Sequence, residues 1–82
     1  MNFAIDPGAN GCVATRNQPF KMPETALDLA CLIRALYADG YRTCYLEEIP
    51  KHGGKNASAM IKLARQYGEV RGVLATVGLR VV

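Results

Sequence analysis

Five short apolar or β-prone runs along the chain are separated by turn residues or by longer amphipathic segments. Runs of this length, bounded by glycine, proline or asparagine, are typical of β-strands. The expected strands cover residues 2–6, 12–15, 19–22, 43–47 and 79–82. The first three are linked by segments 7–11 and 16–18, which are rich in turn-forming residues and predict an antiparallel meander.

Two further segments are predicted to be helical. The first has an apolar stripe at helical spacing made by Leu29, Leu32, Ile33 and Leu36. Pro23-Glu24-Thr25 is expected to open this helix, and Asp39-Gly40 to end it. The second helix is expected over residues 57–76, with Asn56 as its N-cap. The predicted order is therefore βββαβαβ.

The second predicted helix carries small residues at every fourth position, namely Ala64, Gly68, Gly72 and Thr76. Each glycine inside a helix costs about 1 kcal/mol relative to alanine, so this ridge implies a close approach of some other backbone. That backbone is either the sheet or a second copy of the helix. A chain of 82 residues is marginally stable alone, which favours a homodimer.

Two carboxylates occupy equivalent places at strand ends. The first strand ends in Asp6, and the strand at 43–47 ends in Glu47. A strand–helix–strand connection is right-handed and leads to a parallel neighbour, so we expect a mixed sheet of order 3-2-1-4-5. The two acids then lie side by side and can hold one cation between them. Without such a role, Asp6 would be a turn residue and Glu47 a solvated strand end, while Glu48 points away from both.

A glycine-rich basic loop follows Glu47 and Glu48. Lys51, His52 and Lys55 flank the pair Gly53-Gly54, a composition that suits contact with phosphates, although a simple solvated loop would have the same composition. His52 fits a surface histidine better than a ligand or a base. Lys62 and Arg65, on the exposed side of the second helix, would extend this basic track.

Composition narrows the class of protein. The chain has 50% hydrophobic and 21% charged residues and a formal net charge of +3, which indicates one small globular domain that is mildly basic. Its cysteines, Cys12, Cys31 and Cys44, form no CxxC pair and lie in apolar runs, which predicts buried, reduced thiols in a cytoplasmic protein. No apolar run approaches the roughly 18 residues of a membrane span, and Asp6-Pro7 comes too early for a signal peptide.

The chain resembles the RuvC-type Holliday-junction resolvases of the ribonuclease H-like superfamily, especially short phage and bacterial versions. Three stretches carry the resemblance in order: residues 4–8 with Gly11 and Val13, residues 45–49, and the run from Lys55 through Gly68 to Gly72. The resemblance covers essentially the whole chain.

This resemblance implies a magnesium- or manganese-dependent endonuclease that cuts branched DNA as a homodimer. The family's first-strand aspartate corresponds to Asp6, and its fourth-strand glutamate to Glu47. Such resolvases also have a C-terminal helix that brings further acidic ligands, whereas this sequence has no Asp or Glu after Glu69. We therefore expect a truncated domain, 1–82, that lacks part of the metal site.

Three functions are consistent with these features. The first is a minimal resolvase, and the second is a non-catalytic module that retains DNA binding or dimerisation. The third is a nucleotide-binding protein, because actin-like ATPases share the fold and hold phosphate at an Asp-x-Gly turn. Such ATPases use two domains of this kind, so the third is the least favoured.

Overall fold

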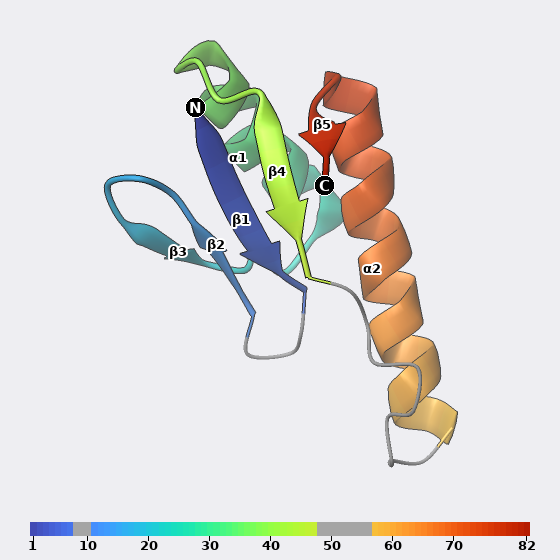
Figure 1. Cartoon of the computed structure of the whole chain (residues 1–82). Helices are drawn as coiled ribbons and strands as arrows, with labels where there is room; N and C mark the ends of the chain where they lie inside the picture. Colours follow the sequence, from blue (N-terminus) through green and yellow to red (C-terminus); the bar gives the residue numbers. More distant parts are fainter. Residues whose placement is uncertain (8–10, 48–56) are drawn as a thin grey trace.

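The protein forms two layers, a five-stranded mixed sheet and two helices that cover one of its faces (Figure 1). The computed structural model describes residues 1–7, 11–47 and 57–82. Its elements are β1 (Asn2–Asp6), β2 (Cys12–Ala14), β3 (Pro19–Lys21), α1 (Ala26–Ala38), β4 (Thr43–Leu46), α2 (Ala57–Val77) and β5 (Arg80–Val81). The predicted order βββαβαβ is confirmed.

The strands lie in the order β3-β2-β1-β4-β5, as the sequence predicts. Strands β1, β2 and β3 form the antiparallel meander, and β4 is parallel to both β1 and β5. The register pairs Ile5 with Leu46 between β1 and β4. Because α1 connects β1–β3 to β4, the carboxyl ends of β1 and β4 meet at the same edge of the sheet.

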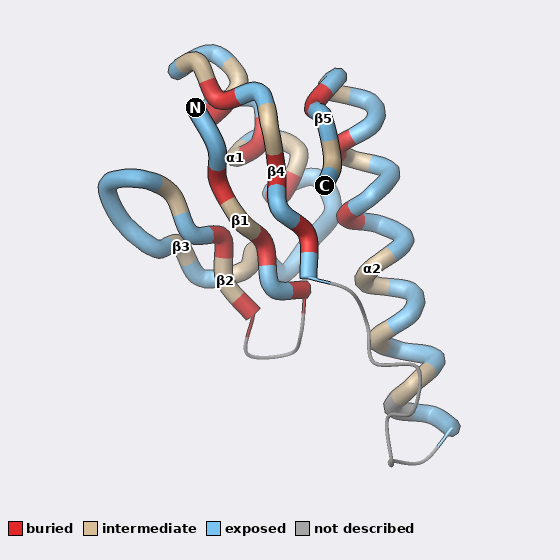
Figure 2. The backbone as a smooth tube through the Cα atoms, in the orientation of Figure 1, coloured by how far each residue is buried: buried red, intermediate tan, exposed pale blue. Residues whose placement is uncertain are grey.

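The core lies between the sheet and the helices. Buried and less buried positions alternate along the central strands (Figure 2), and the buried ones pack with the apolar stripes of α1 and α2. Its fully buried members include Ile5, Val13, Ile33, Cys44 and Leu74. The opposite face of the sheet is not covered by either helix (Figure 1).

Both helices end at a glycine with a left-handed backbone. Gly40 has φ +104° and Gly78 has φ +95°. After α1, the Tyr41 N–H donates to the Leu36 carbonyl oxygen, and after α2 the Leu79 N–H donates to that of Leu74. Each closing bond spans six residues, which is the Schellman arrangement. The predicted end of the first helix is thus confirmed.

The start of α1 differs from the prediction. The helix begins at Ala26, because Thr25 is its N-cap and its side-chain oxygen accepts a hydrogen bond from the Asp28 N–H at 3.1 Å. The first-turn acid is Asp28, while Pro23 and Glu24 precede the helix. A threonine hydroxyl that satisfies an otherwise unpaired N–H fixes the helix start more strongly than the fixed φ of Pro23.

Two of the cysteines are not buried as predicted. Cys44 is fully buried in β4, Cys12 is half-buried, and Cys31 is exposed on α1. The apolar run around Cys31 is helical, so its members alternate between the core and solvent at a period that places Cys31 outside. All three are free thiols.

Tyr41 joins the meander to the helical layer. Its ring packs edge-on against Phe3, with 5.8 Å between ring centroids, and its hydroxyl accepts a hydrogen bond from the Arg16 N–H. Thr15 closes the same turn, since its hydroxyl donates to the Gln18 carbonyl oxygen at 2.7 Å. The β2–β3 turn is therefore held at the amino-terminal edge of β1.

Burial of Cys44 makes the stability of the fold sensitive to alkaline pH. Loss of solvation raises the pKa of its thiol to about 12. In the unfolded chain the thiol ionises near pH 9, so between about pH 9 and 12 the folded state binds more protons and stability falls as pH rises. We expect a loss of about 1.4 kcal/mol from this thiol at pH 10.

Urea unfolding of wild type and Cys44→Ala between pH 7 and 11 measures the contribution of this thiol to the loss of stability. The variant should be less stable at pH 7, because truncation leaves a small cavity. Its further loss above pH 9 should be smaller than that of wild type. Cys31→Ala, which removes an exposed thiol, should leave the alkaline loss unchanged, and parallel pH curves for all three proteins would contradict the assignment.

Candidate metal centre

Asp6 and Glu47 lie next to one another at the carboxyl edge of β1 and β4. Asp6 is the last residue of β1. Glu47 follows β4, and its N–H donates to the Ile5 carbonyl oxygen at 3.1 Å. This bond extends the parallel ladder beyond the Ile5–Leu46 pair and brings Glu47 level with Asp6. Neighbouring strands are about 4.8 Å apart, so the two backbones are close enough for their carboxylates to share a cation.

Both acidic side chains belong to the open face of the sheet. Ile5 and Leu46 point into the core, and side chains alternate along a strand, so Asp6 and Glu47 point the other way and are exposed. They contribute to one hollow of about 390 Å³. Its lining residues are Ala4, Ile5, Asp6, Cys12, Ala14, Tyr45, Leu46, Glu47 and Val82. Among these described residues, Asp6 and Glu47 carry the only charged side chains.

The donor chemistry of this pair fits a hard divalent cation. Magnesium and manganese prefer oxygen ligands, and magnesium keeps several waters when it binds. Two exposed carboxylates beside an open hollow leave room for waters and for a phosphate oxygen. A cation held there would polarise a phosphoryl oxygen and favour ionisation of a bound water.

The described part of the chain supplies two acidic ligands to this place and not more. Within residues 1–7, 11–47 and 57–82, no group of three or more His, Cys, Asp or Glu side chains gathers. Two carboxylates hold an octahedral cation loosely, because most of its coordination positions remain with solvent. The rest of the coordination would come from water and a bound phosphate.

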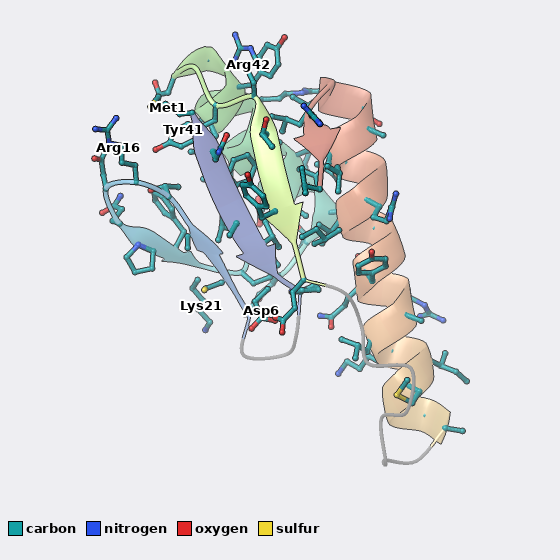
Figure 3. The ribbon with its side chains drawn as sticks, viewed as in Figure 1. Met1, Asp6, Arg16, Lys21, Tyr41 and Arg42 are labelled. Atoms are coloured by element: carbon teal, nitrogen blue, oxygen red, sulfur yellow. The ribbon has the colours of Figure 1, made fainter. Side chains whose placement is uncertain are left out.

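A lysine that the sequence analysis does not single out shares a row with the two acids. Lys21 pairs with Cys12, and Cys12 pairs with Asp6. Directly paired residues of neighbouring strands point to the same face, so Lys21 is exposed on the face that carries Asp6, two strands away (Figure 3). Lys21 is far from Glu47 in the sequence, so only the pairing register of the meander would reveal that it belongs to this row.

The predicted basic residues are described only in part. Lys62 and Arg65 are exposed on α2, as expected. They lie in the amino-terminal half of this helix, which extends past the sheet at the end where β1 and β4 terminate (Figure 1). The loop candidates Lys51, His52 and Lys55, the N-cap candidate Asn56 and also Glu48 lie outside the described residues.

The small-residue ridge of α2 does not pack against the sheet. Ala64, Gly68, Gly72 and Thr76 are all exposed. A Cβ atom added at Gly68 or Gly72 would meet nothing within 4 Å. Of the two explanations for these glycines, contact with the sheet is therefore excluded for the residues that the structure describes.

Comparison with models of known families and with curated proteins gives no match to this chain. None of the helices within the described ranges has the length and apolar character needed to cross a bilayer.

The metal assignment predicts a magnesium-dependent gain in stability. A cation at ten times its dissociation constant stabilises the fold by about 1.4 kcal/mol, which raises Tm by roughly 5–10 °C for a domain of this size. In Asp6→Asn or Glu47→Gln this gain should disappear. Without metal, Glu47→Gln should melt at or above the wild-type Tm, because it lacks one of two neighbouring negative charges.

Differential scanning calorimetry in EDTA and in magnesium or manganese checks both expectations. Asp39→Asn is a matched control, because it removes one acid at the C-cap of α1, at the other end of the fold. This control should keep the metal-dependent gain. An equal gain in all four proteins would show that the cation binds elsewhere.

Proposed function

We propose that this chain is a metal-dependent endonuclease of the Holliday-junction resolvase type, which hydrolyses phosphodiesters in branched DNA. The observation that carries the proposal is the register that sets Asp6 level with Glu47 on neighbouring parallel strands above one open hollow. The strand order is also the order that resemblance to the ribonuclease H-like fold implies.

The residues have distinct parts in this proposal. Asp6 and Glu47 hold the cation and, with it, the scissile phosphate. Lys21, on the same row of the open face, lies where it can contact a neighbouring phosphate. Lys62 and Arg65 extend the positive surface along α2, and the loop residues Lys51, His52 and Lys55 are proposed to continue it.

A second function is favoured by the small number of acidic ligands. The described residues bring two carboxylates together, while hydrolysis by two metals requires ligands that bridge both ions. A chain with this site would bind DNA and a cation yet cut slowly or not at all. The alternative is therefore a non-catalytic DNA-binding and dimerisation module derived from such a resolvase.

Cleavage assays on a synthetic four-way junction separate the two functions. We expect salt-sensitive binding by the purified chain, since the contacts are to phosphates, with weak or undetectable cutting in magnesium. Any cutting should require the cation and both acids, and should disappear in Asp6→Asn and in Glu47→Gln while junction binding persists. Asp39→Asn should cut like wild type.

Rapid magnesium-dependent cutting by the 82-residue chain would exclude the non-catalytic module. Absence of junction binding at low salt, together with no effect of magnesium on Tm, would contradict both functions.

The homodimer is proposed to form through the outer surface of α2. Its ridge of small residues is open, and beside it lies a groove of about 290 Å³ between the two helices. Ile61, one turn before Ala64, is 62% exposed. A second copy of α2 would cover this apolar side chain and use the close approach that Gly68 and Gly72 allow.

Substitution of the ridge glycines should separate folding from assembly. Because there is free space at Gly68 and Gly72, leucine at either position should keep or raise the stability of the single subunit, by up to about 1 kcal/mol from helix propensity. The same substitutions should weaken the dimer by at least about tenfold, since they hold the two helices apart.

Analytical ultracentrifugation across a range of concentrations, with chemical unfolding alongside, measures both effects. Ala35→Leu is the control, because Ala35 is exposed on α1 and does not line the groove. A wild-type protein that stays monomeric at high concentration would contradict the proposed dimer.

A further inference from the structure

The open face of the sheet carries a regular grid of side chains. Its middle row contains Tyr45 on β4, Ala4 on β1 and Ala14 on β2, which the strand register pairs in sequence. The row at the carboxyl edge contains Glu47, Asp6, Cys12 and Lys21. Successive rows on one face are two residues apart, or about 6.6–6.8 Å.

Tyr45 is the large exposed side chain at the centre of this grid. It is 48% exposed, and its neighbours in the same row are the small residues Ala4 and Ala14. Hollows of about 430 and 390 Å³ lie on either side of this row, and both include Tyr45, Ala4 and Ala14 in their lining. Together they form a trough along the strands with an aromatic ring accessible in its middle.

The trough is bordered by positive charge on several sides. Arg16 and Met1 line the first hollow, and Met1 bears the amino-terminal ammonium group. Arg80 pairs with Thr43 and so belongs to the same open face on the β5 side, while Lys21 lies on the β3 side. Arg16, Lys21 and Arg80 are all exposed. The turn that carries Arg16 is held by Tyr41 and Thr15.

A trough with an exposed aromatic ring, small flanking residues and cations around it has the chemistry that single-stranded nucleic acids require. Bases stack on aromatic side chains, small neighbours leave the ring face accessible, and Lys and Arg contact the phosphates. A helix from a protein partner would also bury Tyr45, but it would gain little from three separate cations around an apolar centre.

We propose that the open sheet face binds single-stranded DNA, with one base stacked on Tyr45 and neighbouring phosphates at Arg16 and Lys21. This inference deepens the proposed function and rests on it, because the bound strand would lead from the aromatic row to the acidic pair at the next row. The face would then accept a strand that is unpaired beside a branch point.

Binding of a fluorescent oligothymidylate of about eight nucleotides, followed by anisotropy, tests this assignment. Tyr45→Phe should bind like wild type, because the ring remains. Tyr45→Ala and Tyr45→Leu should each weaken binding by about tenfold or more, because neither offers a π face. Leucine keeps the apolar volume, so wild-type affinity of Tyr45→Leu would overturn base stacking and indicate an apolar docking surface for protein.

The phosphate contacts are tested by the salt dependence of the same binding. Arg16→Ala and Lys21→Ala should each reduce the slope of log K against log salt by roughly 0.7, the value for one contact to a single strand. Arg34→Ala is the matched control, since Arg34 is exposed on α1 in the helical layer. An equal reduction in Arg34→Ala would overturn the assignment of the open face.

A variant without the acidic pair makes this test independent of metal binding. In EDTA, Asp6→Asn/Glu47→Gln should bind the oligonucleotide at least as tightly as wild type, because two negative charges beside the path are removed. If wild type failed to bind the oligonucleotide but still bound the junction and was still stabilised by magnesium, this inference alone would be overturned. If wild type bound the oligonucleotide but magnesium did not raise its Tm, the result would instead count against the metal centre.

Discussion

The parallel pairing of β1 with β4 is the interaction on which the rest of the structure depends. It joins segments that are some 40 residues apart, with the meander and α1 between them. The same register decides which side chains of the two strands enter the core. A slip of one strand by one residue would turn either Ile5 or Leu46 to solvent and place Asp6 or Glu47 inside, at the cost of burying a charge. Core formation therefore fixes the position of the acidic pair.

The difference between the two sheet faces follows from the same pairing. One face carries Phe3, Ile5, Val13, Cys44 and Leu46, which are buried under the helices. The other carries small, aromatic and charged residues and is left open. An exposed sheet face of this composition contributes little to stability, so the core must be made by the helix-covered side alone. The composition of the open face is therefore set less by core packing than by what it can bind.

The sequence predicts the element order and the strand order because its turns and helix ends are marked by distinctive residues. Gly40 and Gly78 adopt the left-handed backbone that ends each helix. Because β2 occupies one edge of β1, a right-handed strand–helix–strand connection places β4 at the other edge. The sequence predicts the start of α1 less well, because the helix is capped by the Thr25 hydroxyl, and Pro23 and Glu24 lie before the cap. It places Cys31 wrongly, because an apolar run does not reveal which side of a helix a residue occupies.

The adjacency of Asp6 and Glu47 is also predicted, since both follow directly from strand ends. Lys21 and Tyr45 are not, because their place depends on register. Lys21 reaches the row of the acids through two antiparallel pairings, and Tyr45 faces solvent only because Cys44 and Leu46 are both inside. A single apolar run such as 43–46 fits a strand that is buried on both faces equally well, so the open face becomes visible only once the helices are seen to cover the other.

The composition of the open face has a consequence for how cation and nucleic acid would act together. Two carboxylates alone leave most of the coordination shell of a magnesium ion to water. A phosphate that also contacts Lys21 would supply a further oxygen ligand and would offset the charge of the cation. Under the proposed function, each ligand therefore raises the affinity for the other by the same factor, as linkage requires. The cation and the DNA strand would each be bound more tightly when the other is present, and the cation would act at the acidic pair chiefly when a phosphate lies beside it.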